Sequence, residues 1–151
     1  MKILMVCLGN ICRSPLAEGI LGTKAKKHNL NLITDSAGTA AYHVGKLPDE
    51  RSIEVAKKYG IDLSNQRARQ FRVQDFEEFD IIYAMDTENY NNILNLASST
   101  DDENKVKLIL NEIEPNSYIS VPDPYYDGDQ GFENVYQMLD TACEKIIEGL
   151  K

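Results

Sequence analysis

The sequence predicts an α/β fold in which helices cover both faces of a parallel sheet. Strand-like and helix-like patterns alternate along the chain, which is typical of parallel strands joined by helices. The first apolar run, KILMVCL at residues 2–8, shows no polar alternation, as expected for a central strand buried on both sides. The length of 151 residues and the hydrophobic fraction of 42% suit a single domain, residues 1–151, with a substantial core.

A helix is expected immediately after the first strand and its short loop. Ser14 can cap this helix, and Pro15 suits its first turn. Leu16, Ile20 and Leu21 then fall on one helical face. The N-terminal part of the chain therefore combines a strand, a tight loop and a helix.

Three further strands and three further helices are expected along the chain. The segments with a strand pattern are residues 31–38, 79–86 and 104–110. The segments with a helix pattern are residues 48–61, 87–98 and 131–151. The last of these has an apolar stripe formed by Val135, Leu139, Ala142, Ile146 and Leu150. Ligands of parallel sheets bind beyond the carboxyl ends of the strands, so we expect a site in the loop after the first strand.

Composition and charge exclude several classes of function. Acidic residues outnumber basic ones, giving a formal net charge of −8, whereas nucleic-acid-binding proteins carry a basic surface. No apolar run approaches the roughly 18 residues that a membrane-spanning helix needs, and the N-terminus lacks a signal-peptide pattern. The three cysteines are too few for a disulfide framework. We therefore expect a cytoplasmic protein with no membrane insertion and no nucleic-acid partner.

The motif VCLGNICRSP at residues 6–15 combines the features of an anion-binding loop. A strand, a tight loop and a helix N-terminus bring successive backbone N–H groups together around an anion. Gly9 and Asn10 are residue types that tolerate a left-handed backbone, so the loop can curl around its ligand. Arg13 supplies a planar fork that matches two oxygens of a phosphate.

Cys7 lies at the end of the first strand, at the floor of this loop. The loop N–H groups, the helix dipole and Arg13 would stabilise its thiolate, which makes Cys7 the expected nucleophile. The backbone donors would also stabilise the phosphoryl oxygens as phosphorus is attacked. The residues expected to contact the phosphate are Leu8, Gly9, Asn10, Ile11, Cys12 and Ser14.

Ser14 and Cys12 have further roles to consider. The Ser14 hydroxyl can donate to the Cys7 thiolate as well as cap the helix. A structural zinc site needs four ligands, and the spacing of the remaining cysteine and histidines does not group them, so we expect no metal. A reversible Cys7–Cys12 disulfide that shields the nucleophile is the favoured alternative. Cys143 falls on the apolar side of the last helix and is expected in the core.

The segment SVPDPYYDGDQGF contains the expected general acid. Hydrolysis of a phosphate monoester needs a proton for the leaving oxygen, and a positioned acid contributes about 10²–10⁴-fold. Asp123 is flanked by two prolines that restrict the backbone around its carboxyl group. Tyr125 and Tyr126 follow and can wall a cleft for an aromatic ring. Asp127 and Asp129 are alternatives in a turn that offers a weaker platform.

Taken together, these residues resemble the low-molecular-weight protein tyrosine phosphatase family over essentially the whole chain. VCLGNICRSPLAE resembles the phosphate loop of the family and DPYYDG its acid loop, and DSAGTAAYHVG and RARQF match landmarks between them. The resemblance implies a flavodoxin-like, four-stranded parallel sheet flanked by helices. It also implies that no metal or cofactor takes part, that a tyrosine-phosphorylated protein is the substrate and that inorganic phosphate is the product.

The resemblance further implies a mechanism in two steps. Cys7 attacks phosphorus to form a phosphocysteine, and Asp123 protonates the leaving phenolate. Asp123 then helps water to hydrolyse the intermediate. Arg13 and the backbone of residues 8–13 bind the phosphoryl oxygens throughout.

Other residues are given supporting roles by the same resemblance. Asn10, Ser14 and Ser36 match positions that stabilise the phosphate loop. Gln66 stands where many members have a histidine in the network that supports this loop. The resemblance therefore does not specify the hydrogen bonds that Gln66 makes.

The walls of the site are matched less closely. Tyr42 occupies a position where other members often carry tryptophan, and with Tyr125 it should flank the phosphorylated ring. Asp86 matches a position near Arg13. It can pair with Arg13 or cap the following helix.

Four alternatives use a similar loop. Arsenate reductases of this fold need two further cysteines near the third strand, and residues 80–100 contain none. Phosphoarginine phosphatases carry threonine where Ile11 stands, so isoleucine favours phosphotyrosine. A sugar-transport phosphocarrier domain needs neither Arg13 nor Asp123. A catalytically silent phosphate-binding module would not need nucleophile, arginine and acid together. The physiological substrate and the oligomeric state stay open.

Overall fold

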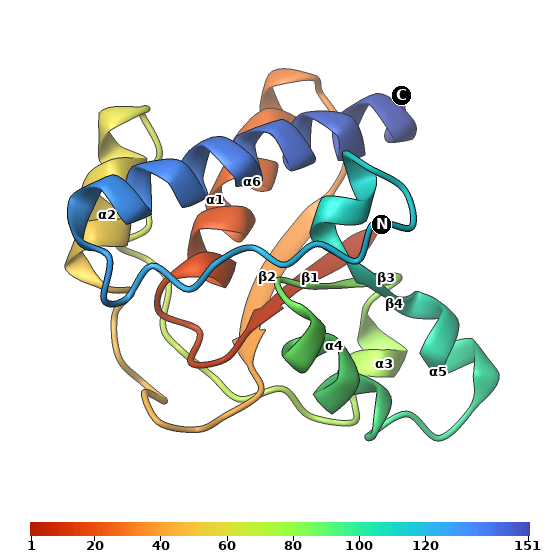
Figure 1. Ribbon diagram of the computed structural model, residues 1–151. Coiled ribbons are helices and arrows are strands. Elements are labelled where there is room, and N and C mark those ends of the chain that lie inside the picture. The colour runs from red at the N-terminus through yellow and green to blue at the C-terminus, as the bar shows by residue number, and fades with distance from the viewer.

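Four parallel strands form the sheet, in the order β2-β1-β3-β4. The computed structural model describes residues 1–151 (Figure 1). The strands are β1 (Lys2–Cys7), β2 (Ile33–Gly38), β3 (Ile81–Ala84) and β4 (Val106–Leu108). The helices are α1 (Arg13–Lys27), α2 (Glu50–Lys58), α3 (Asp75–Glu78), α4 (Thr87–Leu94), α5 (Thr100–Lys105) and α6 (Gly128–Leu150), with a 3₁₀ helix η1 (Ile109–Glu112). The predicted parallel α/β sheet is confirmed.

The central strand β1 positions the loop that the sequence singled out. It pairs with β2 on one side and β3 on the other, so Met5 lies opposite both Ser36 and Tyr83. The chain adds β2 on one side of β1 and then β3 on the other side. This change of direction between β1 and β3 is the topological switch point where ligands of such sheets bind. Cys7, the last residue of β1, pairs with Gly38 at the carboxyl edge of the sheet.

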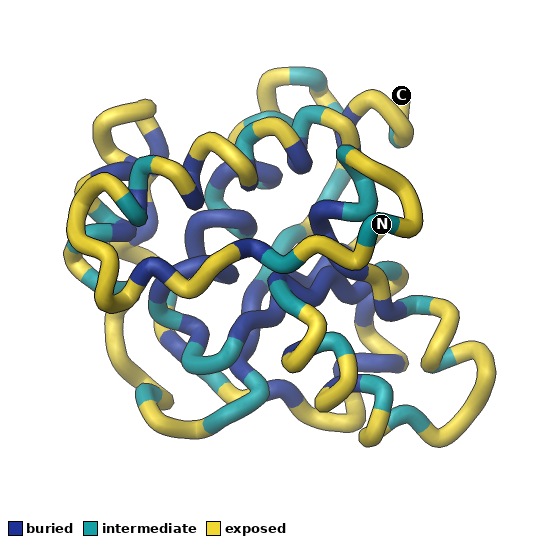
Figure 2. The backbone as a smooth tube through the Cα atoms, in the orientation of Figure 1, coloured by how far each residue is buried: buried dark blue, intermediate teal, exposed yellow.

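Helices cover both faces of the sheet (Figure 1). α1, α2 and α6 pack on one face, and α3, α4 and α5 lie on the other (Figure 1). Ile3 and Met5 of β1 belong to the larger hydrophobic cluster under α1 and α6, and Leu4 and Val6 belong to the smaller cluster on the opposite face. The absence of polar alternation in the first strand thus has the expected cause: both of its faces are buried (Figure 2).

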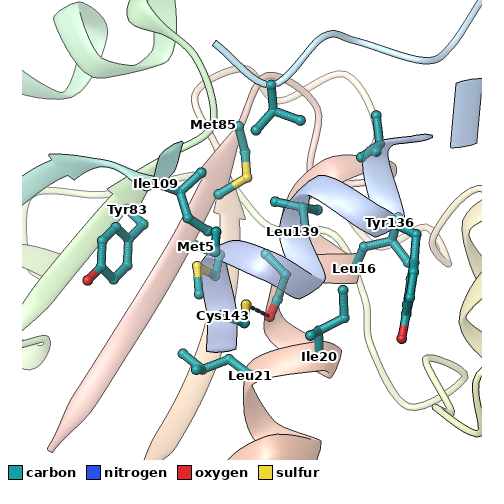
Figure 3. Close-up of a cluster of buried hydrophobic side chains, with 14 of the residues drawn as sticks. Met5, Leu16, Ile20, Leu21, Tyr83, Met85, Ile109, Tyr136, Leu139 and Cys143 are labelled. Atoms are coloured by element: carbon teal, nitrogen blue, oxygen red, sulfur yellow. Dashed lines mark hydrogen bonds between the residues drawn. The ribbon is translucent and has the colours of Figure 1, made fainter. Parts of the chain in front are cut away.

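The larger cluster joins β1, α1 and α6 (Figure 3). Met5, Leu16 and Leu139 are fully buried within it. Cys143 is also fully buried there, with its Sγ 3.9 Å from the carbonyl oxygen of Ala17 (Figure 3). The expectation that Cys143 belongs to the core is confirmed.

The start of α1 differs from the sequence prediction. The helix begins at Arg13, its N-cap is Cys12, and no side chain caps it. The assignment of Ser14 as a cap is therefore wrong, because Ser14 lies inside the first turn and its hydroxyl is engaged elsewhere. The N–H groups at this helix end remain available for another partner.

Other element boundaries differ by a few residues or more. The short helices α3 and α5 were not expected, and α6 begins at Gly128 rather than at residue 131. A capping signal for α5 exists in the sequence: Ser99 accepts a hydrogen bond of 3.1 Å from the N–H of Asp102. α2 ends close to the expected point because Gly60 adopts a left-handed φ of 80°. None of the helices has both the length and the apolar character required to cross a bilayer.

Candidate active site

The loop between β1 and α1 presents its backbone to a shared centre. None of the N–H groups of residues 8–12 donates a hydrogen bond within the protein. Of the two residues expected to tolerate a left-handed backbone, Asn10 adopts one, with a φ of 57°, and Gly9 does not. These free donors and the N-terminus of the 15-residue helix α1 form a cup suited to an anion.

The end of β2 supports the loop from beneath through a close approach at Gly38. A Cβ atom on Gly38 would lie 2.8 Å from the carbonyl oxygen of Leu8 and 3.1 Å from the nitrogen of Asn10. The N–H groups of Thr39 and Ala40 donate to the carbonyl oxygens of Cys7 and Leu8, both at 2.9 Å. Only glycine allows β2 to lie this close to the loop.

Cys7 lies at the floor of the cup and is only 3% exposed. Its Sγ is 3.0 Å from Ser14 Oγ. Asn10 Nδ2 donates to Ser14 Oγ at 2.8 Å, and the Ser14 proton has two acceptors in reach, Cys7 Sγ and, at 3.5 Å, the carbonyl oxygen of Ala37. The hydroxyl can thus donate to a thiolate and stabilise its charge.

Arg13 is buried and held in one orientation by two acceptors. Its Nη1 donates to Asp86 Oδ2 at 2.7 Å and to the carbonyl oxygen of Val121 at 3.0 Å. Burial works to lower the pKa of Arg13, but the nearby Cys7 and Asp86 outweigh it and hold the pKa above its ordinary value. The guanidinium of Arg13 is therefore a fixed and permanent positive charge beside the cup.

Asp86 fills both of the roles that the sequence left open. Its Oδ2 accepts from Arg13, and its Oδ1 accepts a hydrogen bond of 2.7 Å from the N–H of Asn89 as the N-cap of α4. One carboxylate therefore ties the start of α4 to the guanidinium.

Asp123 lies across the cup from the loop. Its side chain is 50% exposed, and its Oδ2 is 3.9 Å from Arg13 Nη2. Its Oδ1 accepts from the N–H of Tyr125 at 3.1 Å. Asp123 is the one carboxylate that lines the cavity. Asp127 and Asp129, the alternatives in the following turn, do not line it.

A cavity of about 300 Å³ opens above the loop. Its lining residues are Cys7, Leu8, Gly9, Ile11, Cys12, Arg13, Tyr42, His43, Asp123, Tyr125 and Tyr126. The tyrosines are its walls: Tyr42 is 76% and Tyr126 93% exposed, and the rings of Tyr125 and Tyr126 meet edge to face at 4.9 Å. Such a mouth suits a flat ring entering between aromatic walls.

Two of the residues expected to contact the phosphate have side chains that lie below the cup, although the N–H of Asn10 is one of the free donors of the loop. Asn10 and Ser14 are buried and do not line the cavity. Asn10 Nδ2 donates to Ser14 Oγ and to Ser36 Oγ, the latter at 2.9 Å. Asn10 Oδ1 accepts from the N–H of Arg69 at 3.0 Å. Their side chains hold the loop in shape, which is the supporting role that the resemblance implied for Asn10, Ser14 and Ser36.

The sequence model described as low molecular weight phosphotyrosine protein phosphatase matches residues 2–151 of the chain. The chain belongs to this family. A Schizosaccharomyces pombe relative named low molecular weight phosphotyrosine protein phosphatase is 42% identical over 152 residues, which cover 99% of this chain and 96% of the relative. Members of the family are hydrolases, and the chain is accordingly a protein-tyrosine-phosphatase by family.

Solved structures of similar proteins agree with the assignment of this phosphatase to the family. The crystal structure of a protein tyrosine phosphatase from Entamoeba histolytica matches with a TM-score of 0.93 and 39% identity, covering 99% of this chain and 96% of that chain. A crystal structure described as a Drosophila arginine phosphatase matches with a TM-score of 0.92 and 34% identity, covering 100% of this chain and 98% of that chain. The flavodoxin-like sheet implied by the resemblance is confirmed.

The phosphatase also contains site residues that sequence reasoning missed. His43 lines the cavity and packs over Gly9, where a Cβ atom would lie 2.9 Å from the His43 ring. Glu18 ends the network under the loop, since Ser36 Oγ donates to its Oε1 at 2.6 Å. His43 directly follows Tyr42, and Glu18 is the last residue of the motif VCLGNICRSPLAE, so both positions were usable signals.

Glu18 lies at the far end of this network, whereas Gln66 bonds outside it. Burial, together with the nearby Asp35, raises the pKa of Glu18 to about 7 against the opposing effects of the Ser36 hydrogen bond and Arg69. Gln66 donates to the carbonyl oxygen of Pro15 at 3.1 Å, and its own Oε1 is buried without a partner. Gln66 therefore supports the first turn of α1 rather than the serines.

Cys12 is buried beside the nucleophile, and all three cysteines are free thiols. Burial raises the pKa of the Cys12 thiol well above its ordinary value, and the nearby Asp49 adds to the effect. Cys12 is thus held as a neutral thiol at physiological pH. The Cys7–Cys12 disulfide stays a prediction.

Proposed function

We propose that the chain hydrolyses phosphotyrosine in proteins through a phosphocysteine intermediate. The observation that carries the proposal is the convergence of Cys7, Arg13 and Asp123 on one cavity at the end of β1. Residues 8–13 are its phosphate cradle: free N–H groups and a buried guanidinium favour a dianion there.

In the first step the Cys7 thiolate attacks phosphorus. The S–P bond forms as the bond between phosphorus and the tyrosine oxygen breaks, and the electron pair goes to that oxygen. Asp123, in its protonated form, gives its proton to the leaving phenolate. The loop N–H groups and Arg13 stabilise the charge on the three equatorial oxygens.

In the second step water attacks the phosphocysteine. Asp123, now a carboxylate, takes a proton from the water as the new O–P bond forms. The S–P bond breaks, inorganic phosphate is released, and the Ser14 hydroxyl stabilises the returning thiolate of Cys7 from 3.0 Å.

The cavity supports an aromatic phosphoester as the substrate. Tyr42 and Tyr125 can flank the ring, with Tyr126 at the outer edge of the mouth. The free thiols fit a reducing compartment, and we propose the cytoplasm as the site of action.

Phosphoarginine is the second candidate substrate because the chain also matches the Drosophila arginine phosphatase. Ile11 lines the cavity and offers no hydroxyl to a guanidinium. This favours phosphotyrosine over phosphoarginine. Comparable rates on a phosphoarginine peptide and a phosphotyrosine peptide of the same sequence would reverse that preference.

The test is the initial rate on a phosphotyrosine peptide near pH 6 without added metal. We expect Cys7→Ser to be inactive and Asp123→Asn to be slower by about 10²-fold or more. Acid quenching should trap a phosphoenzyme in Asp123→Asn but not in Cys7→Ser. If the wild type binds inorganic phosphate but hydrolyses no phosphotyrosine, the proposal is wrong. The cup then binds phosphate for transfer or for sensing.

A further inference from the structure

Arg51, on the first turn of α2, bonds to the acid loop, the segment of residues 122–127 that contains Asp123. Its Nε and Nη2 form a fork on the two carboxylate oxygens of Asp49, each at 3.0 Å. Its Nη1 donates to the carbonyl oxygen of Tyr125 at 2.8 Å. The guanidinium carbon also lies 4.4 Å from the ring centroid of Phe132 and 5.3 Å from that of Tyr125.

The same turn of α2 is bonded to the phosphate loop. The N–H of Asp49 donates to the carbonyl oxygen of Ile11 at 2.8 Å. Ser52 Oγ donates to the carbonyl oxygen of Cys12 at 3.2 Å. Residues 49–52 therefore contact the cup on one side and the acid loop on the other, and α2 sets the separation between the two.

On its N-terminal side the acid loop is held through Val121, which bonds to Met85 and Arg13, and Asp123 lies 3.9 Å from Arg13. Within residues 122–127, the bond from Arg51 to Tyr125 is the one hydrogen bond that reaches the rest of the chain. Two residues of this segment are prolines, which have no N–H to donate. The segment crosses in front of α1 and reaches the start of α6 beside α2 (Figure 1).

We propose that Arg51 is a positioning residue for the general-acid step. By fixing the carbonyl of Tyr125 to α2, it holds Asp123, two residues earlier, above Cys7. The role needs arginine because a planar fork can grip one carboxylate and still present a third N–H to a carbonyl. The inference rests on the proposed function of Asp123.

The leaving group separates this role from a merely structural one. Asp123 matters most when the departing oxygen is strongly basic, as the phenolate of tyrosine is, with a pKa of about 10 in free phenols. A dinitrophenolate is a weak base and leaves without a proton. Loss of acid positioning should therefore slow phenyl phosphate selectively, whereas damage to the cup should slow both esters.

The experiment compares kcat/KM for phenyl phosphate and for 2,4-dinitrophenyl phosphate. In Arg51→Met the apolar stem can still pack on Phe132, but the three hydrogen bonds are lost. We expect a loss of about 10–100-fold on phenyl phosphate and a change of less than about twofold on the dinitrophenyl ester. Inhibition by inorganic phosphate should be unchanged, because the cup is intact.

Three further variants sharpen the comparison. Asp49→Asn keeps an acceptor at the N-cap of α2 but weakens the fork, so the same selective loss should appear at smaller size. The double variant Arg51→Met/Asp123→Asn should be no slower than Asp123→Asn alone. Arg67→Met, at an exposed arginine that bonds only to carbonyl oxygens of its own turn, is the matched control and should behave as wild type.

Two results would overturn the inference. One is an equal loss on both esters in Arg51→Met and in Asp49→Asn, which indicates damage to the cup or to folding. The other is wild-type kinetics in a folded Arg51→Met enzyme. If Asp123→Asn itself has no effect on phenyl phosphate, the acid assignment under the proposed function is what fails, whatever Arg51 does.

Discussion

Ser36 donates a hydrogen bond of 2.6 Å to Glu18 and thereby places an ionisable group at the end of the network that shapes the phosphate loop. Asn10 joins this pair to Ser14, which in turn contacts Cys7. The nucleophile thus stands three hydrogen-bonded side chains away from a half-buried carboxyl group.

Glu18 should make the stability of the enzyme depend on pH. Its pKa is raised by burial from an ordinary 4.5 to about 7, so the folded protein holds a proton that the unfolded chain has released between these values. Stability from this group is present below pH 4.5 and is lost as the pH rises through about 7. Glu18→Gln removes this dependence. The free energy of unfolding of the variant, relative to that of the wild type, should therefore be about 2–3 kcal/mol higher at pH 8 than at pH 5.

Urea unfolding at the two pH values measures this difference. Glu54→Gln, at an exposed position of α2, is the control and should not change the pH dependence. An equal effect of Glu18→Gln at pH 5 and pH 8 would show that the carboxyl group is already ionised in the folded protein.

Ser14→Ala should slow turnover while leaving the fold intact. The change removes the hydroxyl 3.0 Å from Cys7 Sγ but keeps the bond from Asn10 to Ser36. A hydrogen bond to a charged group is worth about 1.5–3 kcal/mol, so we expect kcat to fall by about 10-fold or more. Steady-state rates check this, with exposed Ser64→Ala as control. A large rise in KM at unchanged kcat would assign Ser14 to substrate binding instead.

Asp86→Asn separates the two roles of that carboxylate. Asparagine caps helices about as well as aspartate, so α4 should stay folded. The charged partner of Arg13 at 2.7 Å is lost, and the guanidinium should be less well fixed. We expect inorganic phosphate to inhibit about 10-fold more weakly, measured beside the exposed control Asp101→Asn. A drop in melting temperature with unchanged phosphate inhibition would contradict this reasoning.

Gly38→Ala should damage the cup directly. The new Cβ would lie 2.8 Å from the carbonyl oxygen of Leu8, and backbone atoms on both sides must move. We expect a loss of about 1–3 kcal/mol in stability together with weaker phosphate inhibition. Gly149→Ala in α6 meets nothing within 4 Å and should instead stabilise the protein slightly. Thermal unfolding of the pair is the measurement, and a neutral Gly38→Ala would show that β2 can withdraw freely.

The parts of the fold and site that could be predicted share one property: their signals are local. The buried strand, the loop with its cysteine and arginine, and the aspartate between two prolines each lie within a short stretch. Cys7, Arg13 and Asp123 were expected at one site for this reason, and the structure places all three around one cavity.

The parts that could not be predicted depend on contacts between distant segments. Arg69 reaches Asn10 across 59 positions, and Ser36 reaches Glu18 across 18. Neither pair follows from residue type until the register of β1 and β2 is known. The capping role of Ser14 was misjudged because a serine before a proline is a good cap in isolation. Its expected contact with Cys7 is present at 3.0 Å.

The side chain of Asn10 has a consequence for the rate as well as for the shape of the loop. It donates twice and accepts once inside the protein, so the curved backbone is held whether or not an anion is bound. The dipoles of the cup are thus preorganised, and little reorganisation energy is spent when charge develops on phosphorus. Water, in contrast, must reorient around each new charge. The enzyme has met that cost during folding, before any substrate arrives.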